Sequence, residues 1–217
     1  MKYFIVTRGS FPGIYTNERD AIRATREFRN GRKNYGFTYN EDDAISSYEA
    51  LSGETIIDYN DIKLGPHEAL SFVDGSFNPR NNKYGCGGIV KYVDGERKMH
   101  QQTIMGSRKD KYSAMRNIAG ELLGVILVLE FARKNDIKKI YILFDYLGIC
   151  RWASDRWKCK TRLTKGYRDY VMRLKKRGLD IKFIKVKAHS GVEGNEMVDY
   201  LAKKSVGIID KKYTKEE

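Results

Sequence analysis

The chain has 217 residues, which is enough for one ordinary domain and a second small one. Its hydrophobic content of 41% suffices for a globular core, and no apolar run is long enough to cross a membrane, which excludes a transmembrane protein. The net charge of +13 favours a polyanionic partner. Because the sequence carries no amphipathic or lipidation signal for a membrane surface, nucleic acid is the expected polyanion.

The cysteines Cys86, Cys150 and Cys159 are scattered, without a CxxC pair or histidines at metal-ligand spacing. We therefore expect reduced thiols and a cytoplasmic protein. The first residues offer only a short apolar patch before charges return, so we expect no signal peptide. Nothing in the sequence requires a protein partner.

Residues 1–48 predict a small module with the element order ββαβα. Two short alternating strands surround a Gly- and Pro-containing turn, and Asn17 caps the helix that follows. A basic loop then leads to a strand at 35–39 and a second short helix. The module is too small to enclose a pocket.

Residues 49–68 lose this periodicity and are predicted to be a linker, followed by a second domain at 69–210 and a charged tail at 211–217. The order of elements predicts an α/β domain with a mixed five-stranded sheet flanked by helices. The expected elements are strands at 69–77, 84–92 and 96–105, a long helix from about 117, a strand at 137–145, a helix at 147–155, a strand at 179–187 and a last helix opening at 194–195.

Four acidic residues stand where predicted strands or helices end. Two are at strand ends, Asp74 and Asp145, and two are on helices, Glu121 and Asp199. Side chains at strand ends and first helical turns converge on the same edge of an α/β sheet, so we expect the carboxylates to meet there. Their repulsion and desolvation would cost several kcal/mol, which a divalent cation removes. Each acid alone also has an ordinary interpretation, as a turn residue, a helix N-terminal residue or a surface residue.

The expected ligands are all oxygen donors, without Cys or His beside them, which favours Mg²⁺ or Mn²⁺ over Zn²⁺. Carboxylates that hold two such ions about 4 Å apart suit in-line displacement at phosphorus. The sequence therefore predicts phosphodiester hydrolysis.

Four segments resemble type 1 ribonucleases H in the order expected for that family. They are Phe72-Val-Asp-Gly-Ser76, Arg116-Asn-Ile-Ala-Gly-Glu-Leu122, Ile142-Leu-Phe-Asp-Tyr146 and Lys187-Ala-His-Ser-Gly-Val-Glu-Gly-Asn-Glu-Met-Val-Asp199. The resemblance implies the ribonuclease H fold and an endoribonuclease that cleaves the RNA strand of RNA/DNA hybrids with two metal ions, leaving 5′-phosphate ends.

The same resemblance assigns roles to individual residues. It implies that Asp74, Glu121, Asp145 and Asp199 hold the metals and that His189, on a loop, assists proton transfer or product release. Asn117 matches a residue that contacts the ribose 2′-hydroxyl of the RNA strand, the group that distinguishes RNA from DNA. The chain departs from the family at Tyr146, where many members have Ser, at Ile118, where a polar residue is common, and at Gly120.

The first module resembles the hybrid-binding, viroplasmin-like domain at the N-terminus of type 1 ribonucleases H. The resemblance rests on Tyr3-Phe-Ile-Val-Thr-Arg-Gly9, on Pro12-Gly-Ile-Tyr-Thr16 and on the basic and aromatic segment before the last helix. It implies that Lys33, Tyr35 and Phe37 bind an RNA/DNA hybrid or double-stranded RNA. The usual Trp at the helix start is replaced by Asn17-Glu18. The alternative is a packing or protein-interaction module.

Residues 151–187 are strongly basic, and Trp152 and Trp157 are interleaved with the charges. By resemblance to members with a basic protrusion, the DNA strand is expected to lie on Trp152, Trp157, Lys158 and Lys160. The alternative is that Trp152 belongs to the core and that the lysines form a solvated helix face. Two other functions remain open for the chain as a whole: a module that binds hybrids or double-stranded RNA without cutting, and a nuclease of the integrase or resolvase type, which shares this acidic sheet edge.

Overall fold

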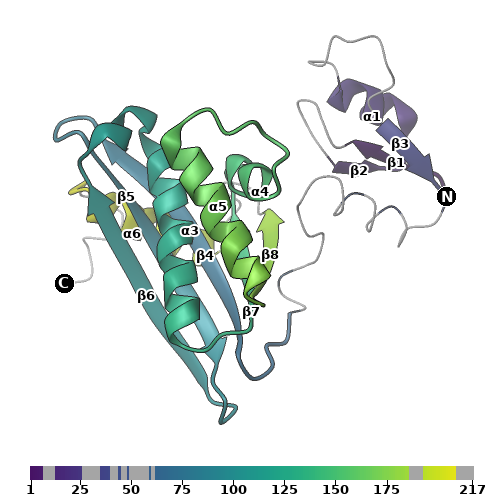
Figure 1. Cartoon of the computed structure of the whole chain (residues 1–217). Helices are drawn as coiled ribbons and strands as arrows, with labels where there is room; N and C mark the ends of the chain where they lie inside the picture. Colours follow the sequence, from purple (N-terminus) through teal and green to yellow (C-terminus); the bar gives the residue numbers. More distant parts are fainter. Residues whose placement is uncertain are drawn as a thin grey trace. The chain divides into compact units, whose positions relative to one another are not determined.

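The structure is a computed structural model, and it describes residues 1–6, 13–25, 35–39, 44, 48, 59, 62–185 and 193–208. The chain divides into two compact units, Met1–Ile56 and Ile57–Glu217, and each is described by itself (Figure 1). Among the described helices none is both long enough and apolar enough to span a membrane.

The first unit is built on an antiparallel sheet with the strand order β2-β1-β3. These strands are β1 (Tyr3–Val6), β2 (Gly13–Tyr15) and β3 (Tyr35–Thr38), and helix α1 (Glu18–Ala24) follows β2. Alternate residues of β1 face opposite sides of the sheet, as the twofold period of a strand requires. Phe4 and Val6 therefore pack on α1, whereas Ile5 packs with Ala44 and Tyr48. The Asn17 side chain caps α1 by accepting from the Arg19 N–H, at 2.8 Å.

The second unit contains a five-stranded mixed sheet with the order β6-β5-β4-β7-β8. Strands β4, β5 and β6 pair antiparallel, while β7 and β8 continue the sheet parallel to β4. This arrangement confirms the fold class expected from the sequence. The bounds are β4 (Glu68–Asn78), β5 (Lys83–Val93), β6 (Met99–Arg108), η2 (Lys111–Met115), α3 (Asn117–Lys134), β7 (Lys139–Phe144), α4 (Gly148–Ala153), α5 (Arg162–Lys176), β8 (Asp180–Lys185) and α6 (Glu193–Ser205).

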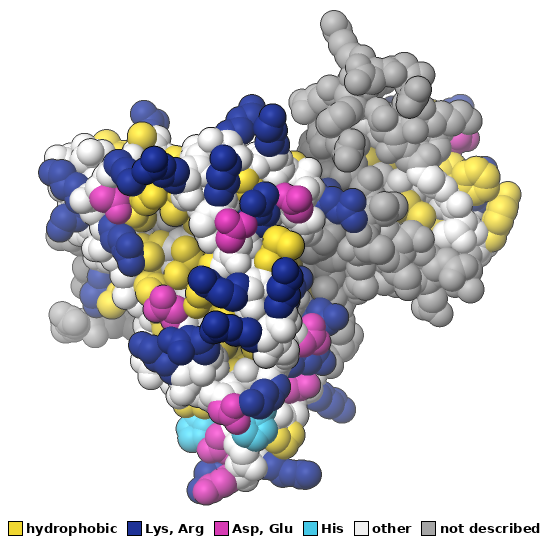
Figure 2. Space-filling model, viewed as in Figure 1, with side chains coloured by type: hydrophobic (Ala, Val, Ile, Leu, Met, Phe, Trp, Pro, Cys, Tyr) yellow, Lys and Arg dark blue, Asp and Glu magenta, His cyan; other side chains and the backbone are white. Residues whose placement is uncertain are grey.

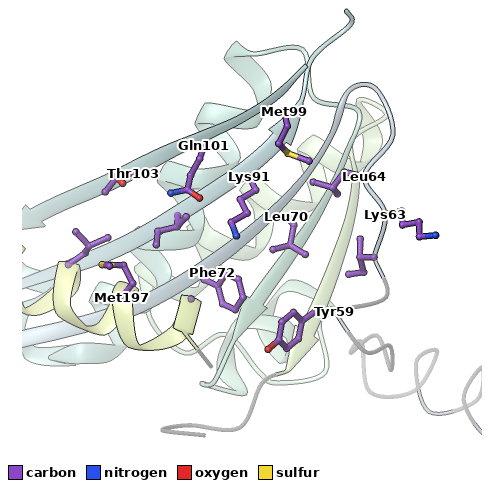
Figure 3. Close-up of a pocket in the computed structure, with 14 residues that line it drawn as sticks. Tyr59, Lys63, Leu64, Leu70, Phe72, Lys91, Met99, Gln101, Thr103 and Met197 are labelled. Carbon is purple, nitrogen blue, oxygen red and sulfur yellow. The ribbon is translucent and has the colours of Figure 1, made fainter. Parts of the chain in front are cut away.

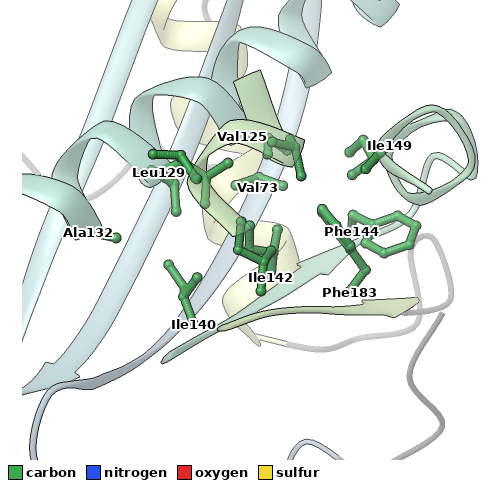
Figure 4. Close-up of a cluster of buried hydrophobic side chains, with 14 of the residues drawn as sticks. Val73, Val125, Leu129, Ala132, Ile140, Ile142, Phe144, Ile149 and Phe183 are labelled. Atoms are coloured by element: carbon green, nitrogen blue, oxygen red, sulfur yellow. The ribbon is translucent and has the colours of Figure 1, made fainter. Parts of the chain in front are cut away.

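Each face of this sheet has its own core. Helices α3, α4 and α5 cover one face and α6 lies on the other (Figure 1). On the first face, Ile140 and Ile142 of β7 pack against Val125 and Leu129 of α3 (Figure 4). On the second face, β4 contributes Leu70 and Phe72, β5 Ile89 and α6 Val198 and Leu201. Strands β4 and β7 contribute side chains to the cores on both faces of the sheet, so packing on both sides fixes their position.

Two boundaries differ from those expected. Strand β6 begins at Met99 rather than at residue 96, because the Asp94 side chain accepts from the N–H groups of Glu96 and Lys98, both at 2.9 Å, and keeps the chain turning. The second unit begins at Ile57, before the end of the expected linker at residue 68. Ile62 and Leu64 explain that difference, since they pack on the α6 face of the sheet.

Candidate metal centre

Three acidic side chains from separate elements meet at one edge of the sheet. Asp74 lies in β4, Glu121 in the first turns of α3 and Asp145 directly after β7. Each offers a carboxylate oxygen, and these oxygens all lie within 4.8 Å of one another. Strand pairing explains the placement, because β4 and β7 are parallel neighbours and deliver their acids to the same edge.

The surroundings of Asp74 and Glu121 hold the two carboxyl groups in different ways. The N–H of Gly75 donates to Asp74 Oδ1 at 2.7 Å. Glu121 is only 3% exposed, and its Oε2 atom is buried without a hydrogen-bond partner among the described residues. A buried carboxylate oxygen without a donor is unfavourable unless a cation or a proton compensates it.

The crowding of the acids changes their pKa values. Burial, and then the charge of Asp145, raises the pKa of Asp74 to about 7, with a smaller contribution from Asp199. Burial, followed by the charges of Asp74 and Asp145, raises the pKa of Glu121 well above its usual range. Both shifts have the same physical cause, the crowding of buried carboxyl groups at one place, which a bound cation would relieve.

Asp199 does not belong to this group of three, although the sequence predicted a quartet. It lies inside α6, which begins at Glu193, and its Oδ2 atom is 2.7 Å from Nζ of Lys203, four residues later. Its charge nevertheless acts on Asp74. Lys203 was not among the predicted site residues. Its spacing of four residues from Asp199 on a helix is typical of an ion pair and could have indicated this contact.

The donor set fits a hard divalent cation. The three residues present oxygen atoms only, and such ligands suit Mg²⁺, Mn²⁺ or Ca²⁺ rather than Zn²⁺. The buried Oε2 atom of Glu121 supplies a further reason, since a cation at this place would give it a partner.

The residues expected to bind nucleic acid beside this centre are not equivalent. Asn117 is exposed at the first position of α3. Trp152 is only 9% exposed and belongs to the core, which was the alternative left open by the sequence. Trp157 is 40% exposed, and its ring stands 5.7 Å from that of Trp152 in a T-shaped arrangement. Lys158 and Lys160 are exposed beside it.

A row of aromatic rings leads from the acids toward this segment. The ring of Tyr146, which follows Asp145, lies 5.9 Å from that of Trp152. Burial and, second, the charge of Glu121 raise the pKa of the Tyr146 hydroxyl above its usual range. Figure 2 shows Lys and Arg side chains spread over the face that carries α3 and α5. The buried ring of Trp152 thus contacts Trp157 from the side of the core.

The remaining site residues lie in the first unit or in segments that the structure does not describe. His189 and Lys33 lie outside the described residues. Tyr35 opens β3. Phe37 is 55% exposed, and Nζ of Lys2 lies 4.0 Å from the centroid of its ring.

A groove of about 640 Å³ lies on the α6 face of the sheet (Figure 3). Leu70 and Phe72 form its floor, and Met99, Met197 and Lys91 stand around it. Among the described residues that line the groove, none carries a carboxylate. It therefore lacks the groups that the expected chemistry needs.

Comparison with known proteins identifies the family of the chain. The family model for RNase H matches residues 66–207, which is more than half of the chain. The chain therefore belongs to the RNase H family. It is a ribonuclease H, an enzyme that hydrolyses the RNA strand of RNA/DNA hybrids.

Solved structures resemble the chain at low sequence identity. LC9-RNase H1, described as a type 1 RNase H with the type 2 active-site motif, has 18% identity and a TM-score of 0.52, covering 67% of this chain and 75% of its own. RNase H1 from Halobacterium salinarum NRC-1 has 16% identity and a TM-score of 0.49, with coverages of 64% and 97%. LC11-RNase H1 in complex with RNA/DNA hybrid has 16% identity and a TM-score of 0.47, with coverages of 64% and 99%. No curated protein sequence matches the chain.

Proposed function

We propose that Asp74, Glu121 and Asp145, joined by Asp199, bind two Mg²⁺ or Mn²⁺ ions and that this centre cuts the RNA strand internally, leaving 5′-phosphate and 3′-hydroxyl ends. The observation that carries the proposal is the convergence of three carboxylates within 4.8 Å of one another in a chain of the RNase H family. When bound, the cations supply water activation and stabilisation of the charge that develops on the leaving 3′-oxygen.

The protein's own groups prepare the site for this step. Glu121 is fixed by burial, and Asp74 is oriented by the N–H of Gly75. Asp199 is held by Lys203, so it joins the centre only by turning from that ion pair or by acting through its charge. We assign proton handling to His189 on the basis of the resemblance to the family.

Substrate binding is proposed to use exposed groups on both sides of the carboxylates. Asn117 lies one helical turn before Glu121 and is exposed, a suitable place to meet a ribose 2′-hydroxyl. Trp157, Lys158 and Lys160 offer a ring for stacking and two cations for phosphates, which suits the DNA strand. Trp152 supports Trp157 from the core rather than contacting nucleic acid itself.

For the first unit we propose a hybrid-binding, viroplasmin-like role on RNA/DNA hybrids or double-stranded RNA. The exposed rings of Phe37 and Tyr39, 55% and 69% accessible, support it, together with Lys2 above Phe37. Lys33 and Tyr35 belong to the proposal through the sequence resemblance.

We also propose a cytoplasmic location, which the buried free thiols of Cys86, Cys150 and Cys159 support.

The test is hydrolysis of a hybrid labelled on the RNA strand, with Mg²⁺ and with EDTA. We expect Asp145→Asn to lose hydrolysis and to keep hybrid affinity. Asp180→Asn is the matched control, because Asp180 is an exposed acid at the start of β8 that pairs with Lys182. Hydrolysis that survives both EDTA and Asp145→Asn would refute the site. Tight binding without turnover would instead indicate a binding module, and cleavage of a DNA duplex would indicate the integrase or resolvase reaction.

A further inference from the structure

The backbone of α3 touches strands β4 and β5 directly beside the metal centre. A Cβ placed on Gly120 would lie 2.2 Å from the carbonyl oxygen of Gly85 and 3.0 Å from Cα of Gly75. A Cβ placed on Gly75 would lie 2.3 Å from the backbone nitrogen of Glu121 and 2.5 Å from the backbone oxygen of Asn117. The helix and the sheet therefore meet backbone to backbone, with no side chain between them.

Among the described residues, no side-chain cap fixes the first turn of α3. Its N-cap residue, Arg116, has a φ of 52° and makes no side-chain cap hydrogen bond. The Oε2 atom of Glu121 has no hydrogen-bond partner among the described residues. The location of this carboxylate then depends on how closely the helix approaches β4.

We infer that Gly120 is a positioning residue for the cation site: by admitting the backbone of Gly85 and Gly75 against the first turn of α3, it sets the separation between Glu121 and Asp74. The inference rests on the proposed function, because it concerns the geometry of that same site. Glycine is a poor helix former compared with alanine, so its presence at this position needs a reason of this kind. A Cβ here would force α3 to retreat by on the order of 1 Å before the contact became an ordinary one.

The chain provides a matched control on the same helix. Gly124 lies one turn further along α3, and a Cβ there would meet the Cβ atoms of Cys86, at 3.3 Å, and Val73, at 3.6 Å. The contact with Cys86 is tight and needs that side chain to shift by a few tenths of an ångström, whereas the contact with Val73 and a third one, with the backbone oxygen of Asp74 at 3.8 Å, are ordinary van der Waals contacts. Gly124→Ala makes the same chemical change in the same helix without the backbone collision.

The test measures cation affinity apart from catalysis. Purified wild-type protein, Gly120→Ala and Gly124→Ala are stripped with EDTA and titrated with Mn²⁺ by calorimetry, and thermal unfolding is recorded without metal. We expect Gly120→Ala to bind Mn²⁺ about tenfold or more weakly, the range seen when groups behind a metal ligand are changed, and Gly124→Ala to bind as the wild type does. In hydrolysis, Gly120→Ala should need correspondingly more cation, with an unchanged KM for the hybrid.

A second variant separates positioning from general damage. Asp74→Glu lengthens the facing side chain by one methylene, so it should weaken Mn²⁺ binding in the wild type and partly restore it in Gly120→Ala. Unchanged Mn²⁺ affinity in Gly120→Ala would overturn the inference, as would a Gly120→Ala protein that does not fold or equal losses in both alanine variants. If the wild type binds no Mn²⁺ at all, the proposed metal centre fails, and the role of Gly120 fails with it.

Discussion

The carboxylate centre and the segment from Trp157 to Lys160 are built on opposite principles. In the centre, Glu121 is 3% exposed, Asp74 lies within β4 and Asp145 directly follows β7, two strands that are covered on both faces. In the segment, Trp157 is 40% exposed and the lysines stand in solvent between α4 and α5. Interactions between buried charges are strong and poorly screened by salt, whereas interactions between exposed charges are weak and strongly screened. The proposed chemistry is thus placed in the buried region and the proposed substrate binding in the exposed one.

The largest effect is expected from Glu121→Gln. This change keeps the shape of the side chain and removes the charge that a cation needs, so hydrolysis should fall about a thousandfold or more, equivalent to several kcal/mol of lost charge stabilisation. Single-turnover rates at saturating hybrid measure it. Hybrid affinity in Ca²⁺ should stay near that of the wild type, and a large loss of affinity would show that the two regions are not separable.

Asp199→Asn should have a smaller effect, because the structure leaves this residue outside the group of three. We expect a loss of about 10- to 100-fold, the range typical of groups that tune a metal site from behind its ligands. Lys203→Gln is the companion variant, since it releases the Asp199 carboxylate from its 2.7 Å ion pair. A thousandfold loss in Asp199→Asn would instead make Asp199 a full ligand.

Substitutions of Trp152 and Trp157 test the comparison between the buried and the exposed region, because opposite phenotypes are expected for them. Trp157→Ala should weaken hybrid binding by about 1 kcal/mol, roughly fivefold, and leave the Tm nearly unchanged, because its ring is exposed. Trp152→Ala removes a core side chain and should destabilise the fold by about 3–5 kcal/mol. Binding isotherms and thermal unfolding of both variants distinguish them. A large affinity loss in Trp152→Ala at an unchanged Tm would contradict its placement in the core.

Neutralising Lys158 and Lys160 together should act mainly on the salt dependence of binding. Each phosphate contact contributes about 0.9 to the slope of log affinity against log salt, so the double Gln variant should lose a slope of about 1.8. The rate at saturating hybrid should not change. Identical slopes for the double variant and the wild type would remove this segment from the interface.

The smallest effect is a dependence of stability on pH in the absence of metal. The folded-state pKa of Asp74, about 7, lies above its ordinary value of 3.8, so its contribution to stability is present below pH 3.8 and is lost as the pH rises through about 7. In EDTA, the Tm of Asp74→Asn minus the Tm of the wild type should therefore increase as the pH rises from 3.8 to about 7. Adding Mg²⁺ should remove the gain. A constant difference in Tm across the window would argue against the crowding of the acids.

Much of the centre could be predicted from the sequence because Asp74 and Asp145 terminate apolar runs, whose burial fixes where the next residue lies. The separate position of Asp199 has a local cause, since its carboxylate is paired with Lys203 one turn later, and its role in the centre stays a prediction. Trp152 was ambiguous because every residue of α4 is buried, which leaves no amphipathic pattern to separate the core side from the solvent side. Exposure of Trp157 follows from its position after that helix.

Strand β6 ends the sheet, and among the described residues it pairs only with β5. Over its ten residues Arg108 is the sole Lys, Arg, Asp or Glu, although 32% of the whole chain is charged. Such an edge has few charges of its own to prevent strand-to-strand association, so the overall charge of +13 must keep two molecules apart. In 1 M salt, where the screening length shrinks to about 3 Å, that repulsion disappears. Concentrated solutions of the protein should therefore aggregate more readily in about 1 M salt, a condition used to remove bound nucleic acid during purification, than at low salt.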